Sequence, residues 1–591
     1  MGRICSAQGV IRGTLVASLI ISSVIGRHQH DVPSCRVIPG DEQWPTDETW
    51  ADFNQSISGR LIRTVPIASV CHGSTYDEGK CATLRDNWFF PATHLPSSSS
   101  PMAYEWSNDS CNPFTPPEAP CVIGNHVLYA VNATGLSDYQ ATLAFASKHN
   151  IRLVIRSSGH DYLGKSTGAH ALALWTLHLK STQLLPTFKS STYAGGAMKI
   201  GAGVSGGEAQ AFAHSHGRVV VVGNCPSVTL AGGWVQGGGH GILSSKYGLG
   251  ADQVLEFEVV TADGELLTIT PYNDHADLFW ALTGGGGGTF GVVLSMTIKT
   301  YPETPISIAL LTVTRPPNRD PKTFKSFFRT FLSTLPATLD SGVTVIWALF
   351  PTAFMIFPAA GPDLTAQQLD FLLQPTRARL KELDFPYEYS SNTYPDYPSA
   401  FASVPRTWNA SDYHMNGRLI PRSLVETSND GGPSEELIDA LLHIGNLAGN
   451  AGVSYNLNAN LPAHPVSVNP KLRSTIFNLA LGVPINYTAA VPQHSYAEAH
   501  DFMNSVLLEP IKKVAPDGGA YLSEASPYEN EWKRDFYGGN YDELLKVKDK
   551  YDPVGLFYAW TGVGSDRWVE RADGRLCRVE FAKDEIVHSE L

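Results

Sequence analysis

The sequence predicts an α+β protein of two or three domains, and three features support this prediction. The chain has 591 residues, several times the ~100 to 200 residues of a usual domain. Between residues 127 and 155, an apolar run, a helical stretch and a second apolar run indicate a strand, a helix and a strand. From about 303 to 510, helical and strand patterns mix. We therefore expect a second α+β domain there, with room for a pocket at the junction.

The elements of the first unit follow from apolar periodicity and turn residues. The run from Val127 (VLYAV) and the run 151–155 predict buried strands. Residues 137–140 (SDYQ) indicate a capping box that opens a helix lasting to His149. The helix would cross between the two strands.

Further along, the chain predicts strands again. The stretch 255–261 alternates and meets the turn signal Ala-Asp-Gly before residues 266–269, which indicates a hairpin. Glycine then concentrates at 284–288 and is followed by the apolar stretch 290–298. Residues 27–118 are rich in Pro, Ser, Trp and Cys with little periodicity, so we expect an irregular Cys-rich extension there, without a catalytic role.

Composition and charge exclude several classes of protein. Apolar residues make up 43% and charged residues 17% of the chain, as in an ordinary globular protein. The net charge is −13, and no Lys/Arg run stands out, so we expect no nucleic-acid partner and no anionic membrane surface. The histidines show no metal-ligand spacing, so no metal is predicted. A small-molecule partner is the better expectation.

The N-terminus indicates secretion. Arg3 and Arg12 precede the apolar stretch 14–25, and Gly26 closes a candidate cleavage site, so residues 1–26 are expected to be a signal peptide. The stretch is shorter than the ~20 residues of a spanning helix. Sequons fit a glycosylated secretory protein; they lie at Asn54, Asn108, Asn132, Asn409 and Asn486.

Cysteine arithmetic leaves one thiol over. After loss of the signal peptide seven cysteines remain, so in an oxidising compartment one stays unpaired. Cys225 alone sits inside a glycine-rich motif, and the other six can form three disulfides whose connectivity the sequence leaves open. No spacing matches a CxxC zinc pattern.

The first chemical motif is RSSGHD at 156–161, directly after a predicted strand. Its small residues would let backbone N–H groups approach a diphosphate. The stretch from Gly159 to Ser166 also matches the phosphate loop GxxxxGK[ST] letter for letter. A P-loop needs a helix after Ser166, whereas Gly168 intervenes and residues 171–179 alternate like a strand. An NTPase is therefore the rival prediction from another class.

The second motif runs from GNCPSV at 223–228 through Gly232 and Gly233 to GGGHG at 237–241. Such glycine density allows a backbone to wrap a flat ligand. The spacing does not match GxGxxG, so a Rossmann dinucleotide site is not predicted.

The segment 119–302 resembles the PCMH-type FAD-binding domain of the vanillyl-alcohol oxidase superfamily, and the berberine bridge enzyme-like group is the most similar. Fungal members with a long Cys-rich N-terminus, similar to isoamyl alcohol oxidase, are often found with natural-product pathways. The resemblance implies a substrate-binding domain at 303–510 and a berberine bridge enzyme-like segment at 511–582. It rests on RSSGHDYLGKSTG, GNCPSVTLAGGWVQGGGHG, DLFWALTGGGGGTFGVV and KDKYDPVGLFYAWTGVGSDRW.

The resemblance implies a covalent FAD. In the family, the histidine that matches His160 is bonded to a methyl group of the flavin. In members with G-x-C-P, the cysteine that matches Cys225 is bonded to a neighbouring ring carbon, which would account for the odd thiol. The other residues expected at the cofactor are Arg156, Ser157, Ser158, Gly159, Asp161, Ser166, Val228, Gly232, Gly233, Gly238, Gly239, His240, Gly241 and Val293.

The catalytic base is expected in the tail. Residues 520–524 (AYLSE) resemble a family motif that faces the pocket, so Tyr521 is the first candidate and Glu524 the second. A tyrosine of pKa ~10 needs a nearby positive charge or strong hydrogen bonds to act as a base, and a structural tyrosine is the alternative. Ser523 stands where many relatives have Asn, which puts the polar contacts of the site in doubt.

The predicted function is that of a secreted FAD-dependent oxidase. It would oxidise an alcohol, an amine or a C–C bond of a small secondary metabolite and pass the electrons to molecular oxygen, with release of hydrogen peroxide. An oligosaccharide oxidase is the alternative, with Trp408, Tyr394 and Tyr397 lining an open groove. A flavoprotein without turnover follows if Ser523 marks lost catalysis. Substrate identity and oligomeric state stay open.

Overall fold

The first half of the protein contains a small four-stranded sheet in which three neighbouring strands run parallel. The computed structural model describes residues 34–579 except 109, 406–408, 427–431 and 489–491, so the predicted signal peptide lies outside the described residues. The strand order is β1-β2-β4-β3, and β2 and β3 both pair with β4 in parallel. These strands are β1 (Leu61–Arg63), β2 (Tyr129–Asn132), β3 (Leu153–Arg156) and β4 (Leu172–Trp175). Helix α4 (Leu136–Lys148) connects β2 to β3, which confirms the predicted strand–helix–strand unit.

The start of α4 differs from the prediction. Its N-cap is Gly135 and no side chain caps it, so the predicted capping box at Ser137 is wrong. The carboxylate of Asp138 instead accepts hydrogen bonds from the backbone N–H and the hydroxyl of Thr134 and pairs with Arg60. Asp138 thereby joins the first turn of α4 to Arg60, the residue before β1, and to the turn that follows β2.

A second, antiparallel sheet follows with the order β5-β6-β10-β8-β9. Its strands are β5 (Thr182–Lys189), β6 (Ala194–Gly201), β8 (Val254–Val260), β9 (Leu266–Ile269) and β10 (Val292–Lys299). Strands β8 and β9 pair in antiparallel fashion from Val260 and Leu266, which confirms the predicted hairpin. The short helices and strands between them are α5 (Gly206–His214), β7 (Arg218–Val219), α6 (Ser244–Tyr247), α7 (Ala276–Leu282) and β11 (Tyr301–Pro302).

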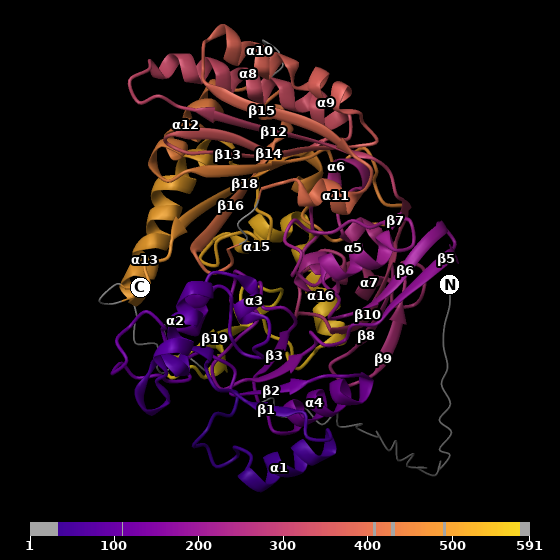
Figure 1. The fold of residues 1–591 in the computed structure, drawn as a ribbon. Coiled ribbons are helices and arrows are strands. Elements are labelled where there is room, and N and C mark those ends of the chain that lie inside the picture. Colours follow the sequence, from indigo (N-terminus) through magenta and orange to yellow (C-terminus); the bar gives the residue numbers. More distant parts are fainter. Residues whose placement is uncertain (1–33, 109, 406–408, 427–431, 489–491, 580–591) are drawn as a thin grey trace, which may run out of the picture. The chain divides into compact units, whose positions relative to one another are not determined.

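The middle of the chain forms a seven-stranded antiparallel sheet with the order β15-β12-β14-β13-β17-β18-β16. The strands are β12 (Ile306–Thr314), β13 (Thr344–Leu349), β14 (Ala353–Pro362), β15 (Tyr387–Tyr394), β16 (Tyr413–Pro421), β17 (Asn450–Ser454) and β18 (Thr475–Pro484). Helices α8 (Pro321–Asp340) and α12 (Glu435–Leu447) are amphipathic and bury Phe and Leu side chains in one core with the sheet. In Figure 1, α8, α9 (Ala366–Leu372) and α10 (Gln374–Glu382) gather on one side of this sheet.

The C-terminal segment returns to the first half of the chain. Helix α16 (Tyr541–Tyr551) packs against α7, and Phe557 forms an isolated parallel β-bridge with Leu153 of β3. One core therefore includes side chains from residues 163–298, 306–404 and 520–563. The remaining elements are α11 (Tyr397–Ala402), α13 (Pro492–Asp501), the π-helix η8 (Phe502–Leu508), α14 (Glu509–Val514), α15 (Trp532–Tyr537), β19 (Trp568–Glu570) and β20 (Leu576–Arg578).

The Cys-rich extension is more regular than predicted. It contains α1 (Asp47–Ser56), α2 (Glu78–Asn87) and α3 (Pro91–His94). Its disulfides join Cys71 to Cys81 and Cys111 to Cys121, while a third joins Cys35 to Cys577. Cys225 stays free, which confirms the predicted odd thiol. None of the helices in the described part of the chain combines the length and apolar character that a membrane span requires.

Candidate cofactor and substrate site

A cavity lies where both glycine-rich motifs meet the C-terminal segment. It contains about 1150 Å³ of empty space, part of it open to solvent. The residues predicted at the cofactor that line it are Ser157, Ser158, Gly159, His160, Asp161, Ser166, Val228, Gly232, Gly233 and Val293. Both predicted catalytic residues, Tyr521 and Glu524, line it as well.

Arg156 supports the loop after β3 from inside the protein and is not part of the cavity wall. The Arg156 side chain is fully buried and does not line the cavity. Its guanidinium donates to the backbone oxygens of Ser97, Ser100 and Ser166. At Gly159 φ is +82°, and a Cβ would lie 2.6 Å from Arg156 Nη2. The loop therefore needs glycine at this position, and Arg156 supports the loop from behind.

His160 and Cys225 come from separate motifs and meet beside the cavity. His160 Nε2 lies 2.8 Å from Ser227 Oγ and 4.0 Å from Cys225 Sγ. The other ring nitrogen, Nδ1, makes no hydrogen bond to any described residue. Burial lowers the pKa of His160 to about 3, with repulsion from His94 and Arg156 as smaller causes. The imidazole is therefore neutral, and its Nδ1 lone pair is available for a bond.

The phosphate-loop match does not fold as a phosphate loop. Between Ser166 and β4 the described chain forms turns and no helix, so a P-loop is excluded. Asp161 accepts the backbone N–H groups of Leu163 and Lys165. Burial raises the pKa of the Asp161 carboxyl and lowers that of Lys165, although their opposite charges partly offset both shifts. This loop is shaped by internal contacts around one carboxylate.

The cavity wall has the properties that a flat, polar cofactor requires. A Cβ built at Gly233 or Gly288 would meet no atom within 4 Å, so the backbone there is open to a ligand. Ser157 Oγ and Gln236 Oε1 are buried without a hydrogen-bond partner among the described residues. Buried polar atoms without partners are costly, and a ligand with donors and acceptors would satisfy them. The residues present fit the FAD that the sequence motifs imply.

Three of the glycines predicted at the cofactor pack closely against neighbouring groups. Gly238, Gly239 and Gly241 do not line the cavity. A Cβ at Gly239 would lie 2.7 Å from the Trp234 ring, and one at Gly241 would overlap the backbone oxygen of Val222 at 1.9 Å. These positions need glycine because neighbouring backbone and aromatic groups are too close for a side chain.

The tail brings a carboxylate and a phenol to the cavity. Glu524 accepts a hydrogen bond from Asn478 Nδ2 at 2.7 Å and lies 3.3 Å from His240 Nε2. The Tyr521 hydroxyl accepts the Gly239 N–H at 3.2 Å. Burial, with a smaller contribution from the Glu524 charge, raises the pKa of Tyr521 far above its usual value. The raised pKa keeps the Tyr521 phenol protonated, so it is not a ready proton acceptor in this environment.

Sequence reasoning did not identify several cavity residues. Gly287 and Gly288 lay in a noted glycine run, but nothing in that run assigned them to the cavity. Asn478 gave no local signal, because its strand β18 belongs to the second domain and reaches Glu524 only in the folded chain. Further polar and aromatic lining residues that it did not assign are Tyr162, Lys165, Thr229, Trp234 and Gln236.

The aromatic groove expected for an oligosaccharide is not assembled from the described residues. Tyr397 is buried in the core and stacks on Phe401. Tyr394 packs partly buried against the same core. Trp408 lies outside the described residues.

Comparisons with known proteins agree with this site. Residues 127–270 match the family described as FAD binding domain, and residues 520–564 match the family described as berberine and berberine like. The FAD-linked oxidoreductase sor8 of Hypocrea jecorina is 44% identical over 549 residues, covering 92% of this chain and 93% of the relative. The VAO-type flavoprotein oxidase VAO615 of Thermothelomyces thermophilus is 40% identical over 559 residues, covering 93% and 96%.

Solved structures show the same fold. The VAO-type flavoprotein MtVAO615 from Myceliophthora thermophila superimposes with a TM-score of 0.87 at 39% identity, covering 92% of this chain and 100% of that one. The berberine bridge enzyme from Eschscholzia californica gives a TM-score of 0.62 at 15% identity, covering 87% and 99%, which shows the fold alone.

Fold and cavity together define a flavoprotein oxidoreductase. The chain belongs to the FAD-linked oxidoreductases of the vanillyl-alcohol oxidase, berberine bridge enzyme-like family. This confirms the predicted α+β fold with a PCMH-type FAD-binding domain, the FAD cofactor and the enzyme class, and it excludes the NTPase.

Proposed function

We propose that this protein is an oxidase that carries FAD bonded to His160 and Cys225. It would oxidise a small organic substrate with molecular oxygen as the electron acceptor. The observation that carries the proposal is the contact of His160, which lines the cavity, with Cys225 behind it, whose Sγ lies 4.0 Å from His160 Nε2. Two nucleophiles that arise 65 residues apart in sequence and converge beside one cavity are suited to bond one ring system.

The two attachments follow from the state of each side chain. Ser227 engages Nε2 of a neutral His160, so Nδ1 is the nitrogen left to bond the flavin methyl group. Cys225 is a free thiol, so its sulfur can bond a ring carbon. Each bond replaces a C–H of the cofactor and an N–H or S–H of the side chain. The two electrons and two protons released in each case leave with oxygen as hydrogen peroxide.

Glu524 is the proposed proton acceptor. When bound, FAD would supply the hydride acceptor and the path of the electrons to oxygen. Asn478 and His240 fix the Glu524 carboxylate at the cavity wall, so it can take the proton of a hydroxyl or amine as the C–H bond breaks. Tyr521 orients the loop at Gly239 and supplies a hydroxyl at the same wall.

The proposed substrate is a small secondary metabolite with an alcohol, an amine or a C–C bond to be oxidised. A relative from Penicillium decumbens, 37% identical over 586 residues, is named a bifunctional decalin synthase. This name supports the proposal that the substrate has a small carbon skeleton. Burial of Tyr397 disfavours the alternative of an oligosaccharide oxidase. A flavoprotein without turnover remains the alternative tied to Ser523, and steady peroxide release with any substrate would contradict it.

We further propose that the protein is secreted and that its domains divide at about 118, 302 and 510. Three disulfides support an oxidising compartment. The seven-stranded sheet spans residues 306–484, which supports a separate substrate-binding domain at 303–510.

The test of covalent attachment needs no substrate. The purified protein is denatured in acid, precipitated and digested, and flavin mass is sought on peptides. We expect flavin on a cross-linked pair of peptides that contain His160 and Cys225. In Cys225→Ser the flavin should remain on the His160 peptide alone, and in His160→Ala on the Cys225 peptide alone. Complete release of flavin from the wild-type protein would contradict the proposal.

A further inference from the structure

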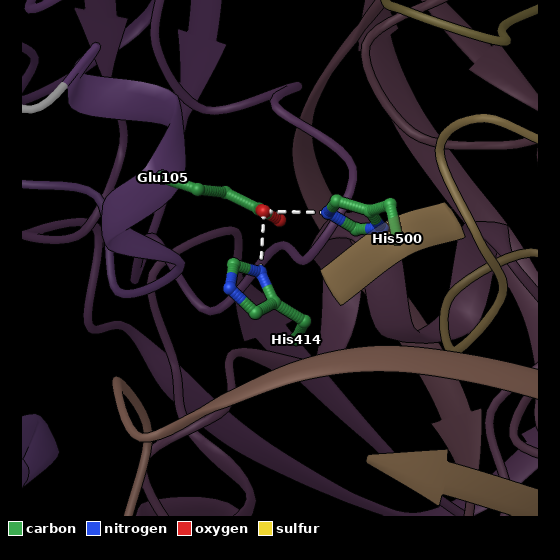
Figure 2. Close-up of side chains that lie close together, drawn as sticks. All are labelled: Glu105, His414 and His500. Atoms are coloured by element: carbon green, nitrogen blue, oxygen red, sulfur yellow. Dashed lines mark hydrogen bonds and ion pairs between the residues drawn. The ribbon is translucent and has the colours of Figure 1, made fainter. Parts of the chain in front are cut away.

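A second group of convergent side chains lies outside the cavity and has no role in the oxidase chemistry. Glu105 comes from the short helix η3 (Tyr104–Ser107) in the Cys-rich extension, His414 from edge strand β16, and His500 from helix α13. None of the three lines the cavity. Figure 2 shows both imidazoles directed at the carboxylate of Glu105.

The three side chains present their ligand atoms to one point. Glu105 Oε2 lies 2.6 Å from His414 Nδ1 and 2.7 Å from His500 Nε2. The candidate ligand atoms all lie within 4.8 Å of one another. One oxygen is thus shared by two nitrogens that come from elements more than 300 residues distant from Glu105 in sequence.

The group is buried and lacks a fixed cation. The exposed fractions of the side chains are 7% for Glu105, 1% for His414 and 4% for His500. Among the lysine and arginine side chains that the structure describes, none pairs with Glu105. Tyr496 packs on His414 and Tyr528 on His500, with ring centroids 5.3 and 4.5 Å apart. The two imidazoles are thus the charge partners that the described chain offers this carboxylate, and a buried carboxylate without a fixed cation is costly.

We propose that Glu105, His414 and His500 bind one divalent first-row transition ion, with Zn²⁺ as the representative metal. Two imidazole nitrogens and a carboxylate oxygen are the donor set that Zn²⁺ and its neighbours take, at ~2.0 to 2.2 Å from the ion. Ligand atoms around such an ion are about 3 Å apart, so the site requires only a small outward shift of the three side chains. The ion would add a fixed positive charge beside the buried carboxylate.

The ion would act as a clamp between distant parts of the chain. It would join the Cys-rich extension to the edge of the seven-stranded sheet and to α13. Because ligands that bind only the folded state stabilise it, bound metal should raise the unfolding temperature without changing the flavin attachment.

The experiment uses the full-length, flavin-loaded protein. It is stripped with a chelator, dialysed, titrated with ZnCl₂ by calorimetry, and analysed for retained zinc by elemental mass spectrometry. We expect one tightly bound zinc per chain and an unfolding temperature that rises by a few degrees, on the scale of a binding energy of a few kcal/mol. If the wild-type protein neither retains zinc nor gains thermal stability from it, the proposal is wrong.

Variants locate the site. Glu105→Gln and His414→Asn should each weaken zinc binding at least tenfold while the protein-bound flavin absorbance is unchanged. His214→Gln is the matched control, because His214 lies 2.8 Å from Glu303 in a similar but exposed His/Glu/Asp group. Loss of the tight zinc in His214→Gln, or its retention in both Glu105→Gln and His414→Asn, would overturn the assignment. If Glu105→Gln does not fold, His414→Asn makes the same test, and X-ray absorption of the zinc-loaded wild type should show two imidazole ligands; absence of imidazole ligands would overturn the assignment.

Discussion

At the scale of single residues, burial decides which side chains can take part in chemistry. Tyr521 and Glu524 are three positions apart and both line the cavity. Burial holds the Tyr521 phenol in its protonated form, whereas the Glu524 side chain keeps 28% exposure and two polar partners. The tail motif alone ranked the tyrosine first, whereas the environment of each group supports the proposal that Glu524 is the base.

Substitution of Glu524 tests this proposal. We expect Glu524→Gln to lower the rate of flavin reduction by about 10²- to 10⁴-fold, the usual contribution of a positioned general base. Tyr521→Phe should lower it less than tenfold. Anaerobic stopped-flow reduction with a substrate found by peroxide screening provides the measurement. Equal rates in Glu524→Gln and the wild type would remove Glu524 from this role.

Glycine at position 159 is a second test at this scale. Gly159→Ala places a Cβ at positive φ and 2.6 Å from the Arg156 guanidinium. Strain of this kind costs about 1 to 3 kcal/mol, so we expect a lower unfolding temperature and incomplete flavin attachment. Gly264→Ala is the control, because φ there is +85° but no atom lies within 4 Å of a Cβ. Equal flavin attachment in the two variants would show that the contact with Arg156 is unimportant.

At the scale of elements, the Cys-rich extension is held by neutral buried histidines. His94 at the end of α3 contacts the Trp88 backbone oxygen through Nε2 at 2.7 Å and Ser100 Oγ through Nδ1 at 2.8 Å. Burial lowers the pKa of His94 and of His126 to about 4. Both imidazoles are therefore neutral in the folded protein. The stability of the extension depends on their remaining unprotonated.

This dependence predicts the pH profile of stability. The folded pKa of about 4 lies below the ordinary value of 6.5, so between these values the unfolded chain binds more protons. The contribution is fully present above pH 6.5 and is lost as the pH falls toward 4, by up to about 3 kcal/mol per histidine. Unfolding temperatures measured from pH 7 to 4 should therefore fall, and less steeply in His94→Gln than in the exposed control His216→Gln. Parallel curves for the two variants would contradict the prediction.

At the scale of the whole molecule, buried polar pairs join segments that are far apart in sequence. Arg418 of β16 pairs with Asp535 of α15, with both side chains no more than 2% exposed. The same guanidinium donates to the backbone oxygens of Ala515 and Pro516. The seven-stranded sheet is thereby attached to the segment that carries Tyr521 and Glu524.

Removal of one partner should therefore be costly. Arg418→Met leaves Asp535 buried without its main cation, and we expect a loss of about 3 to 5 kcal/mol in the free energy of unfolding. The control is Arg422→Met, which breaks two partly exposed pairs, with Asp340 and Glu426, and should cost about 1 kcal/mol or less for each pair. Denaturant titration of both variants provides the comparison. A similar small loss in each would mean that the buried pair does not hold the tail.

The sequence by itself determined the local elements and the chemistry of the site. Apolar periodicity predicted the strand–helix–strand unit and the β8–β9 hairpin, because these patterns depend on neighbours within a few residues. The motifs around His160 and Cys225, the glycine run 284–288 and the segment 548–568 carried the family resemblance and, with it, the FAD. The count of cysteines predicted the free thiol. The start of α4 could not be predicted from its local sequence. Asp138 was expected to belong to a capping box, but it pairs with Arg60, which lies 78 positions away.

Only the tertiary structure decided which residues share a surface. Gly239, Gly241 and Arg156 belong to the motifs yet support the walls from behind, because their neighbours in space come from other segments. Asn478 and the group Glu105, His414 and His500 have no local signature at all. Contacts across hundreds of residues depend on how sheets and loops pack, and that packing is a property of the whole chain.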